Sequence, residues 1–173
     1  MRRDQPSSLG AVIGTSRTPR AWLAEPHEAE AVARLLVAFR DHMGSDWPSA
    51  NAFLASVERL LEDRDTEFLL AAADDRSPPA GVLQLRFRLS VWKAAPDAWL
   101  EDLFVAEQAR RSGLGDALVT LAVERAQARG ARRIELDANE RNAAALALYE
   151  RHGFSARSKG GGGRDLFLGR PLA

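Results

Sequence analysis

The sequence contains no cysteine, which excludes disulfide bonds, Cys-ligated zinc and catalysis by a thiol. No apolar run is long enough to span a bilayer, and the first ten residues, MRRDQPSSLG, lack the apolar stretch of a signal peptide. Basic and acidic side chains number 24 each, so there is no net positive charge to attract nucleic acid. The three histidines show no metal-ligand spacing. We therefore expect a cytoplasmic protein without metal, membrane or nucleic-acid partners.

The chain has 173 residues, 46% of them hydrophobic, which suits one domain with a sizeable core. Residues 1–19 are rich in Arg, Ser, Pro and Gly and show no hydrophobic period. We interpret this stretch as a flexible tail, and residues 20–173 as a single domain.

Hydrophobic periodicity predicts a mixed fold. Spacings of three and four mark helices, and the alternation in GVLQLRFRLS marks a half-buried strand. The predicted strands cover residues 21–24, 67–73, 81–90, 99–105, 133–137 and a final pair within 154–168; the predicted helices cover 27–40, 53–61, 114–130 and 143–151. The order β-α-α-β-β-β-α-β-α-β-β indicates an α/β (α+β) fold with a mostly antiparallel sheet and a βαβ unit in its second half.

The stretch RRSGLG, residues 110–115, joins a predicted strand to a predicted helix. A helix N-terminus has unpaired N–H groups and a partial positive charge, glycines permit close backbone approach, and arginines add forked donors. This joint predicts a pyrophosphate-binding loop. The alternative is an ordinary glycine-capped loop with two solvated arginines.

Two nucleotide motifs were weighed for this loop. A P-loop needs Gly-Lys-Ser/Thr, which does not occur. Gly113 and Gly115 fit the first two positions of the dinucleotide fingerprint GxGxxG, and Asp137 stands where its ribose-binding acid would. However, Leu118 occupies the third glycine position, and the joint follows antiparallel strands. A dinucleotide remains the alternative ligand.

Three segments together resemble the GNAT superfamily, the acetyl-CoA-dependent N-acetyltransferases. Residues 110–115 match that family's loop Q/R-x-x-G-x-G/A, and LEDLFV, residues 100–105, resembles the preceding strand in its diamine and polyamine branch. Further on, NAAALALYERHGF, residues 142–154, resembles the element N-x-x-A-x-x-L-Y-x-x-x-G-F. The resemblance covers roughly residues 22–168.

The resemblance implies that acetyl-CoA lies between the strands at 99–105 and 133–137, and that an amine attacks its thioester directly. The implied cofactor-binding residues are Leu103, Phe104, Val105, Arg110, Arg111, Ser112, Gly113, Leu114, Gly115, Asp116, Asn142 and Tyr149. Members of the family commonly dimerise, which makes a homodimer possible.

Tyr149 is the predicted general acid, because the matching tyrosine of the family protonates the leaving thiolate and a phenol has a suitable pKa. The alternative is a tyrosine that only packs on Phe154. Asn142 lies seven residues earlier, on the same helix face. It is predicted to contact the pantetheine arm, to cap the helix, or both.

Glu101 is the predicted base and Asp102 a predicted substrate-binding residue, because an ammonium must lose a proton before it attacks. In a regular strand the two side chains point to opposite faces, and a β-bulge would change that. Trp47 is a predicted substrate contact through its aromatic face. The expected acceptor is a small primary amine; the alternatives are protein N-termini or lysines, or a non-catalytic CoA-binding module.

Overall fold

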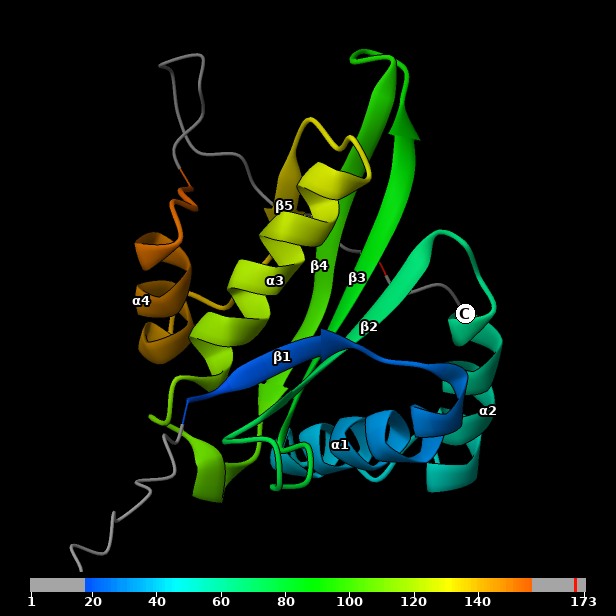
Figure 1. Cartoon of the computed structure of the whole chain (residues 1–173), viewed down its shortest axis with the longest axis vertical. Helices are drawn as coiled ribbons and strands as arrows, with labels where there is room; N and C mark the ends of the chain where they lie inside the picture. Colours follow the sequence, from blue (N-terminus) through cyan, green and yellow to red (C-terminus); the bar gives the residue numbers. More distant parts are fainter. Residues whose placement is uncertain (1–17, 157–169, 171–173) are drawn as a thin grey trace, which may run out of the picture.

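Figure 1 presents the protein as a computed structural model, which describes residues 18–156 and residue 170. Within these residues, five strands form one sheet in the order β1-β2-β3-β4-β5. They are β1 Arg20–Leu23, β2 Thr66–Ala72, β3 Gly81–Ser90, β4 Ala95–Val105 and β5 Ile134–Leu136; the helices are α1 Ala29–His42, α2 Ala50–Leu61, α3 Leu114–Ala128 and α4 Ala143–Arg151. Two 3-10 turns, Pro26–Glu28 and Glu107–Ala109, precede α1 and α3.

The predicted mixed sheet is confirmed. β1 to β4 pair antiparallel, whereas β4 and β5 pair parallel through the crossover helix α3. The strand predicted at 99–105 begins earlier, at Ala95, because the long strand β3 pairs with it as far as Ser90. Most of the predicted tail, and of the predicted final pair of strands, lies outside the described residues.

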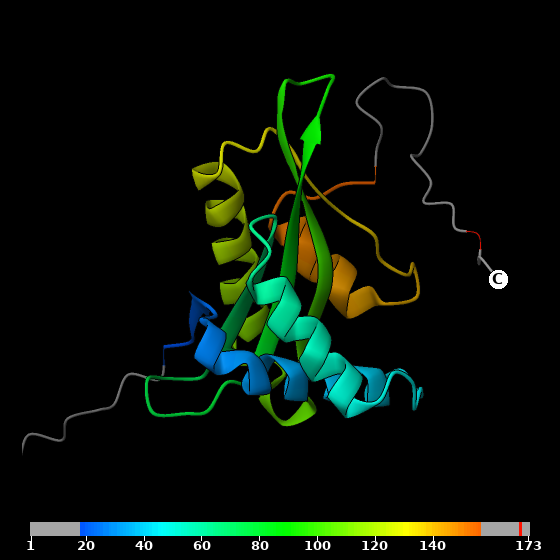
Figure 2. The same ribbon diagram turned by 90° about the vertical axis from the view of Figure 1, so that its right-hand side faces the viewer.

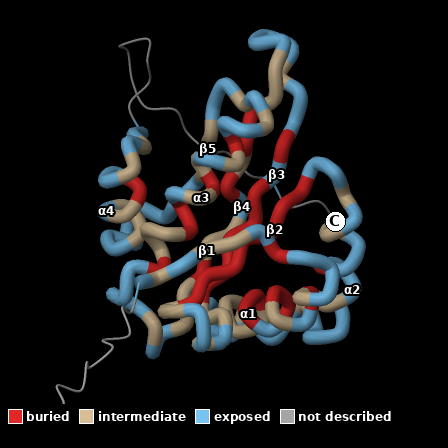
Figure 3. The backbone as a smooth tube through the Cα atoms, in the orientation of Figure 1, coloured by how far each residue is buried: buried red, intermediate tan, exposed pale blue. Residues whose placement is uncertain are grey.

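The sheet is covered on both faces, as the buried centre in Figure 3 shows. On one face, α3 packs Leu118, Val119 and Ala122 against Leu69 and Leu83. Strand β2 is therefore buried along its whole length, since its alternate side chains enter two different cores.

The second core lies under α1 and α2. It contains Val32, Leu35, Leu36, Val57, Phe68, Leu70, Val82 and Phe104. In Figure 2 these two helices cover the lower part of the sheet, and the end of the β3–β4 hairpin extends past them. Of the helices in the described part of the chain, α1 and α2 cover this face, and they do not extend over the far end of β3 and β4.

Candidate active site

β4 and β5 are paired over only three residues. Ala98, Trp99 and Leu100 face Ile134, Glu135 and Leu136, and β4 then continues to Val105 without β5 beside it. The other edge of this segment stays paired with β3, where Leu103 faces Leu83. The predicted cofactor segment, residues 103–105, is therefore paired with β3 along one edge. Its other edge faces the opening between the parallel strands β4 and β5.

The side chains of this segment are anchored in both cores. Phe104 stacks on Phe39 of α1, with ring centroids 5.3 Å apart, and Leu103 and Val105 pack against the core under α3. This anchoring fixes the strand and leaves the backbone groups on its open edge for a ligand, except the Val105 carbonyl, which accepts a hydrogen bond from Arg110.

The predicted phosphate loop has a positive φ at two of its residues. Gly113 is the N-cap of α3 at φ +85°, a conformation that favours glycine, and Arg111 also has a positive φ of 62°. No side chain caps this helix, and its first backbone bond runs from Ala117 N–H to the Gly113 carbonyl. The N–H groups of Leu114, Gly115 and Asp116 precede that bond, so they are available to an anion, as the first donors of a helix are.

Two of the predicted loop side chains already have hydrogen-bond partners within the protein. Arg110 Nε donates to the Val105 carbonyl at 3.1 Å, and its guanidinium lies 3.2 Å from Nε2 of His42. The Ser112 hydroxyl donates to the Ala109 carbonyl. Arg110, Arg111 and Ser112 are all exposed, and Arg111 takes no part in these hydrogen bonds. Its guanidinium and the backbone donors are therefore the groups offered to a phosphate.

Gly115 and Asp116 join α3 to α4. A Cβ on Gly115 would lie 3.1 Å from Cδ2 of Leu148, so glycine here allows close packing of the two helices. Asp116 accepts hydrogen bonds from Arg151 at 3.0 Å and lies 3.1 Å from Nε2 of His152. Desolvation opposes the effect, but the contacts with Arg151 and His152 hold the pKa of Asp116 below its ordinary value. Its carboxylate thus positions α4, a role that the sequence analysis missed.

Tyr149 lies on α4 with its ring buried, edge-on to Phe154 at a centroid distance of 5.8 Å. Burial, and then the negative charge of Asp137, raise the pKa of its hydroxyl. Asn142 caps α4 by accepting a hydrogen bond from Ala145 N–H at 3.1 Å. The packing and capping roles are confirmed, and the ligand roles of both residues remain predictions.

A β-bulge decides where the acidic pair points. Gln84 faces Asp102 and Leu85 faces Leu100, so Glu101 is the extra residue of β4. Leu100 and Leu103 then both pack toward α3, which places Glu101 and Asp102 together on the opposite face. The opposite-face arrangement of a regular strand is therefore wrong here. Burial, followed by the charges of Glu101 and Asp137, raises the pKa of Asp102.

This face carries a cavity of about 610 Å³ on the part of the sheet that α1 and α2 leave uncovered. It is lined by Arg86, Phe87, Arg88, Trp99, Glu101 and Asp137. Within it, Glu101 forms an ion pair with Arg86 at 3.5 Å. The sequence predicts Asp137 only as the ribose-binding acid of the dinucleotide alternative. Asp137 directly follows β5, the parallel neighbour of β4. This position is the sequence signal that could have placed Asp137 beside Glu101 and Asp102.

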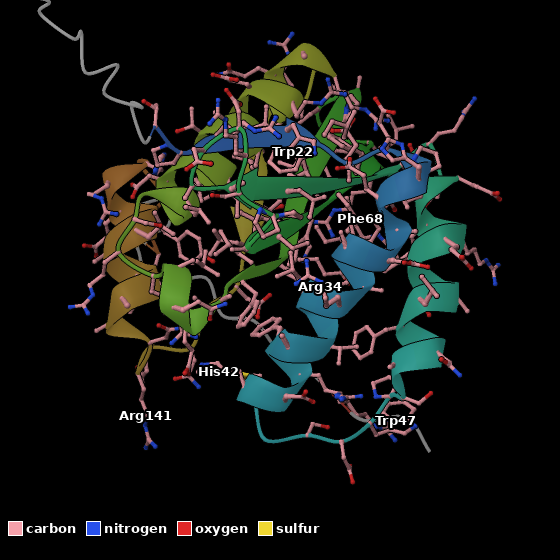
Figure 4. All side chains as sticks on the ribbon, turned by 60° about the horizontal axis from the view of Figure 1, so that its bottom comes forward. Trp22, Arg34, His42, Trp47, Phe68 and Arg141 are labelled. Carbon is pink, nitrogen blue, oxygen red and sulfur yellow. The ribbon has the colours of Figure 1, made fainter. Side chains whose placement is uncertain are left out.

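Trp47 is 78% exposed and is absent from the lining of that cavity. In the view of Figure 4 it lies at the α1–α2 connection, on the opposite side from Arg141, which precedes α4. Its role as a substrate contact remains a prediction. Among residues 18–156, no helix has both the length and the apolarity needed to cross a membrane, and no cluster of histidines and carboxylates suits a metal ion.

The model of the acetyltransferase (GNAT) family matches residues 29–154. The chain belongs to this family. It is 31% identical to the uncharacterized N-acetyltransferase YhfO of Bacillus subtilis over 133 residues, which are 76% of this chain and 86% of that protein. It is 32% identical to the mycothiol acetyltransferase of Beutenbergia cavernae over 150 residues, 82% of this chain but 43% of that longer protein.

The fold agrees with this membership. A crystal structure from Arthrobacter sp. FB24, provisionally named as an acetyltransferase, superimposes with a TM-score of 0.78 at 29% identity, covering 98% of this chain and all of that one. The protein is therefore an N-acetyltransferase of the GNAT family. The likeness does not extend to a particular branch, so the diamine and polyamine branch is not confirmed.

Proposed function

We propose that this GNAT enzyme transfers the acetyl group of acetyl-CoA directly to the primary amine of a small molecule. The observation that carries the proposal is the opening between β4 and β5, with the uncapped N-terminus of α3 at one end and Tyr149 beside it. An extended donor would pair with β4 through its amides and place its pyrophosphate at the helix.

The residues present fit acetyl-CoA. Residues 103–105 offer backbone groups along an edge that β5 does not cover, as an added β-strand requires, although the Val105 carbonyl is bonded to Arg110. Gly113 at a positive φ, Arg111, and the first N–H groups of α3 offer donors to a pyrophosphate. A dinucleotide remains the alternative ligand, and its binding is one of the outcomes tested below.

The chemistry requires two proton movements. The amine nitrogen attacks the thioester carbon, the C–S bond breaks, and the departing sulfur takes a proton. Tyr149 supplies that proton: burial and Asp137 raise the pKa of its hydroxyl, so it stays protonated at neutral pH.

The amine must also lose a proton, and Glu101 is our predicted base. Its carboxylate is paired with Arg86, so an ammonium substrate would compete with that guanidinium. Asp102 is a competing base, because its raised pKa brings it closer to neutrality, where proton acceptance is most effective. Asp137 completes the acidic group and supports binding of the ammonium. The homodimer and the cytoplasmic location stay predictions.

The proposal is tested in two steps. First, acetyl-CoA should raise the melting temperature, as a ligand specific to the folded state does, and NADH should not. Second, release of free CoA thiol should be measured with a panel of small amines and with peptides that carry free N-termini or lysines. Turnover of small amines supports the proposal. Turnover of peptides alone would indicate an enzyme that modifies proteins. Stabilisation by NADH alone would show that the site binds a dinucleotide instead of acetyl-CoA.

A further inference from the structure

The cavity floor crosses three strands in register. Arg86 of β3 faces Trp99 of β4, and Trp99 faces Glu135 of β5, so these residues form a row across the sheet. Residues two positions along each strand form the neighbouring rows on the same face, about 7 Å away. Asp137 belongs to the row on one side, and Arg133 to the row on the other.

The row with Asp137 is acidic. It also holds Glu101 and Asp102, which the bulge brings to this face, and the pKa of Asp102 is raised first by burial and then by the two neighbouring carboxylates. At this end of the cavity, Arg86 is the cationic side chain paired with Glu101. Negative charge is therefore in excess beside Tyr149, as binding of an ammonium requires.

The opposite end is basic. Arg88 and Arg133 share one acid, Glu135, at 3.1 and 2.6 Å, and the guanidinium of Arg88 lies 5.7 Å from the ring centroid of Trp99. The arginine side chains are 64% and 50% exposed, whereas that of Glu135 is 20% exposed.

The neighbouring acid of the hairpin does not neutralise this end. Asp97 is held by Lys93 of the turn, with Nζ at 2.8 Å from its carboxylate. One positive charge therefore remains, together with guanidinium N–H groups that face solvent.

We propose that the acceptor is an amino carboxylate: its primary amine binds at the acidic end of the cavity, and its carboxylate binds at the basic end to Arg88 and Arg133. This inference rests on the proposed function. The acidic and basic rows are two row spacings apart at the backbone, roughly 14 Å. However, the side chains of Arg88 and Arg133 both reach back to Glu135 in the middle row, which leaves their guanidinium groups about one row spacing, roughly 7 Å, from the acidic row. The two charges of such a molecule are separated by about that distance. Trp99 lies between the two ends and contacts the intervening carbon chain. A diamine of the same length places its second ammonium against the arginines instead.

Three acceptors of matched length test the inference in the thiol-release assay: 6-aminohexanoate, 1,6-diaminohexane and hexylamine. The wild-type enzyme should show a kcat/KM for the amino acid about tenfold above that for the diamine, since a charge-assisted bond to a guanidinium has that worth. Arg88→Gln and Arg133→Gln should each reduce this ratio several-fold, mainly by raising KM for the amino acid. Arg59→Gln, an exposed arginine of α2, is the matched control and should keep the ratio.

The outcomes separate the inference from the function that it rests on. A diamine used as well as the amino acid, or a ratio that both arginine variants leave unchanged, overturns the inference while acetyl transfer stands. Activity toward other amines but not toward 6-aminohexanoate also overturns the inference while acetyl transfer stands. If no amine of the panel is acetylated, both the proposed small-molecule function and the inference are wrong. Melting temperatures of the variants confirm that each is folded.

Discussion

The carboxylate of Asp137, which follows β5, raises the pKa of the Tyr149 hydroxyl on α4, adding to the larger effect of burial. Asp137 also adds to the raised pKa of Asp102 on β4, after burial and Glu101. One side chain thus couples the predicted acid to the acidic pair across the opening between the two strands.

This coupling can be measured directly, because Tyr149 is the single tyrosine of the chain. Spectrophotometric titration of tyrosinate should give a midpoint above 10.0, the ordinary pKa of a tyrosine. Asp137→Asn removes the nearby negative charge and should lower that midpoint, and Asp46→Asn in the α1–α2 connection should leave it unchanged. An identical midpoint in wild type and Asp137→Asn would show that the two side chains do not interact.

Tyr149→Phe keeps the buried ring and its contact with Phe154 and removes only the hydroxyl. If the hydroxyl protonates the thiolate, kcat should fall by about 10²- to 10⁴-fold, the usual contribution of general acid catalysis. The dissociation constant of acetyl-CoA should change little, since the lost interaction is made mainly in the transition state. A wild-type rate for the Phe variant in a single-turnover experiment would reduce Tyr149 to a packing residue.

The acidic pair is separated by pH profiles of kcat/KM. If Glu101 removes the amine proton, Glu101→Gln should lose most activity at neutral pH and less at alkaline pH, where the free amine is abundant. If Asp102 is the base, Asp102→Asn will show that pattern instead. A loss that is constant across pH for Glu101→Gln would assign it to cation binding or to its ion pair with Arg86.

Asp102 should also affect stability. Burial, then Glu101 and Asp137, raise its pKa in the folded state above 3.8, the ordinary pKa of an aspartate, which the unfolded chain has. Between those two pKa values the folded protein binds more protons than the unfolded chain, so stability falls as pH rises through this window. Asp102→Asn removes the buried charge and should raise the melting temperature at pH 7. The gain should shrink below about pH 4, where both states are protonated; an equal gain at both pH values would contradict it.

Gly113→Val tests the phosphate loop, with Gly130→Val as its matched control at the other end of α3. Both glycines have positive φ, of 85° and 73°, so each variant should lose about 1–3 kcal/mol of stability through backbone strain. Only Gly113→Val adds a side chain to the predicted cradle. It alone should abolish the rise in melting temperature with acetyl-CoA. If acetyl-CoA raises the melting temperature of both variants equally, the pyrophosphate does not bind at this loop.

Local patterns in the sequence determined much of the fold. The order of the described elements, the antiparallel pair β2–β3, the glycine-capped start of α3 and the Asn142 cap of α4 were all predicted, because each depends on residues a few positions apart. The family could also be predicted, since its motifs at residues 110–115 and 142–154 are each a short continuous stretch of sequence.

Pairing between distant segments was decided only in the tertiary structure. The register of β3 on β4 makes Glu101 a bulge residue and turns it to the same face as Asp102. The pairing of β5 with β4 brings Asp137 and Glu135 onto that face, beside arginines fifty residues earlier in the chain. Asp116 and Gly115 read locally as phosphate ligands, yet the packing of α3 on α4 gives them Arg151 and Leu148 as partners. Strand register and helix packing minimise the free energy of the whole chain, so a local pattern of residues does not contain them.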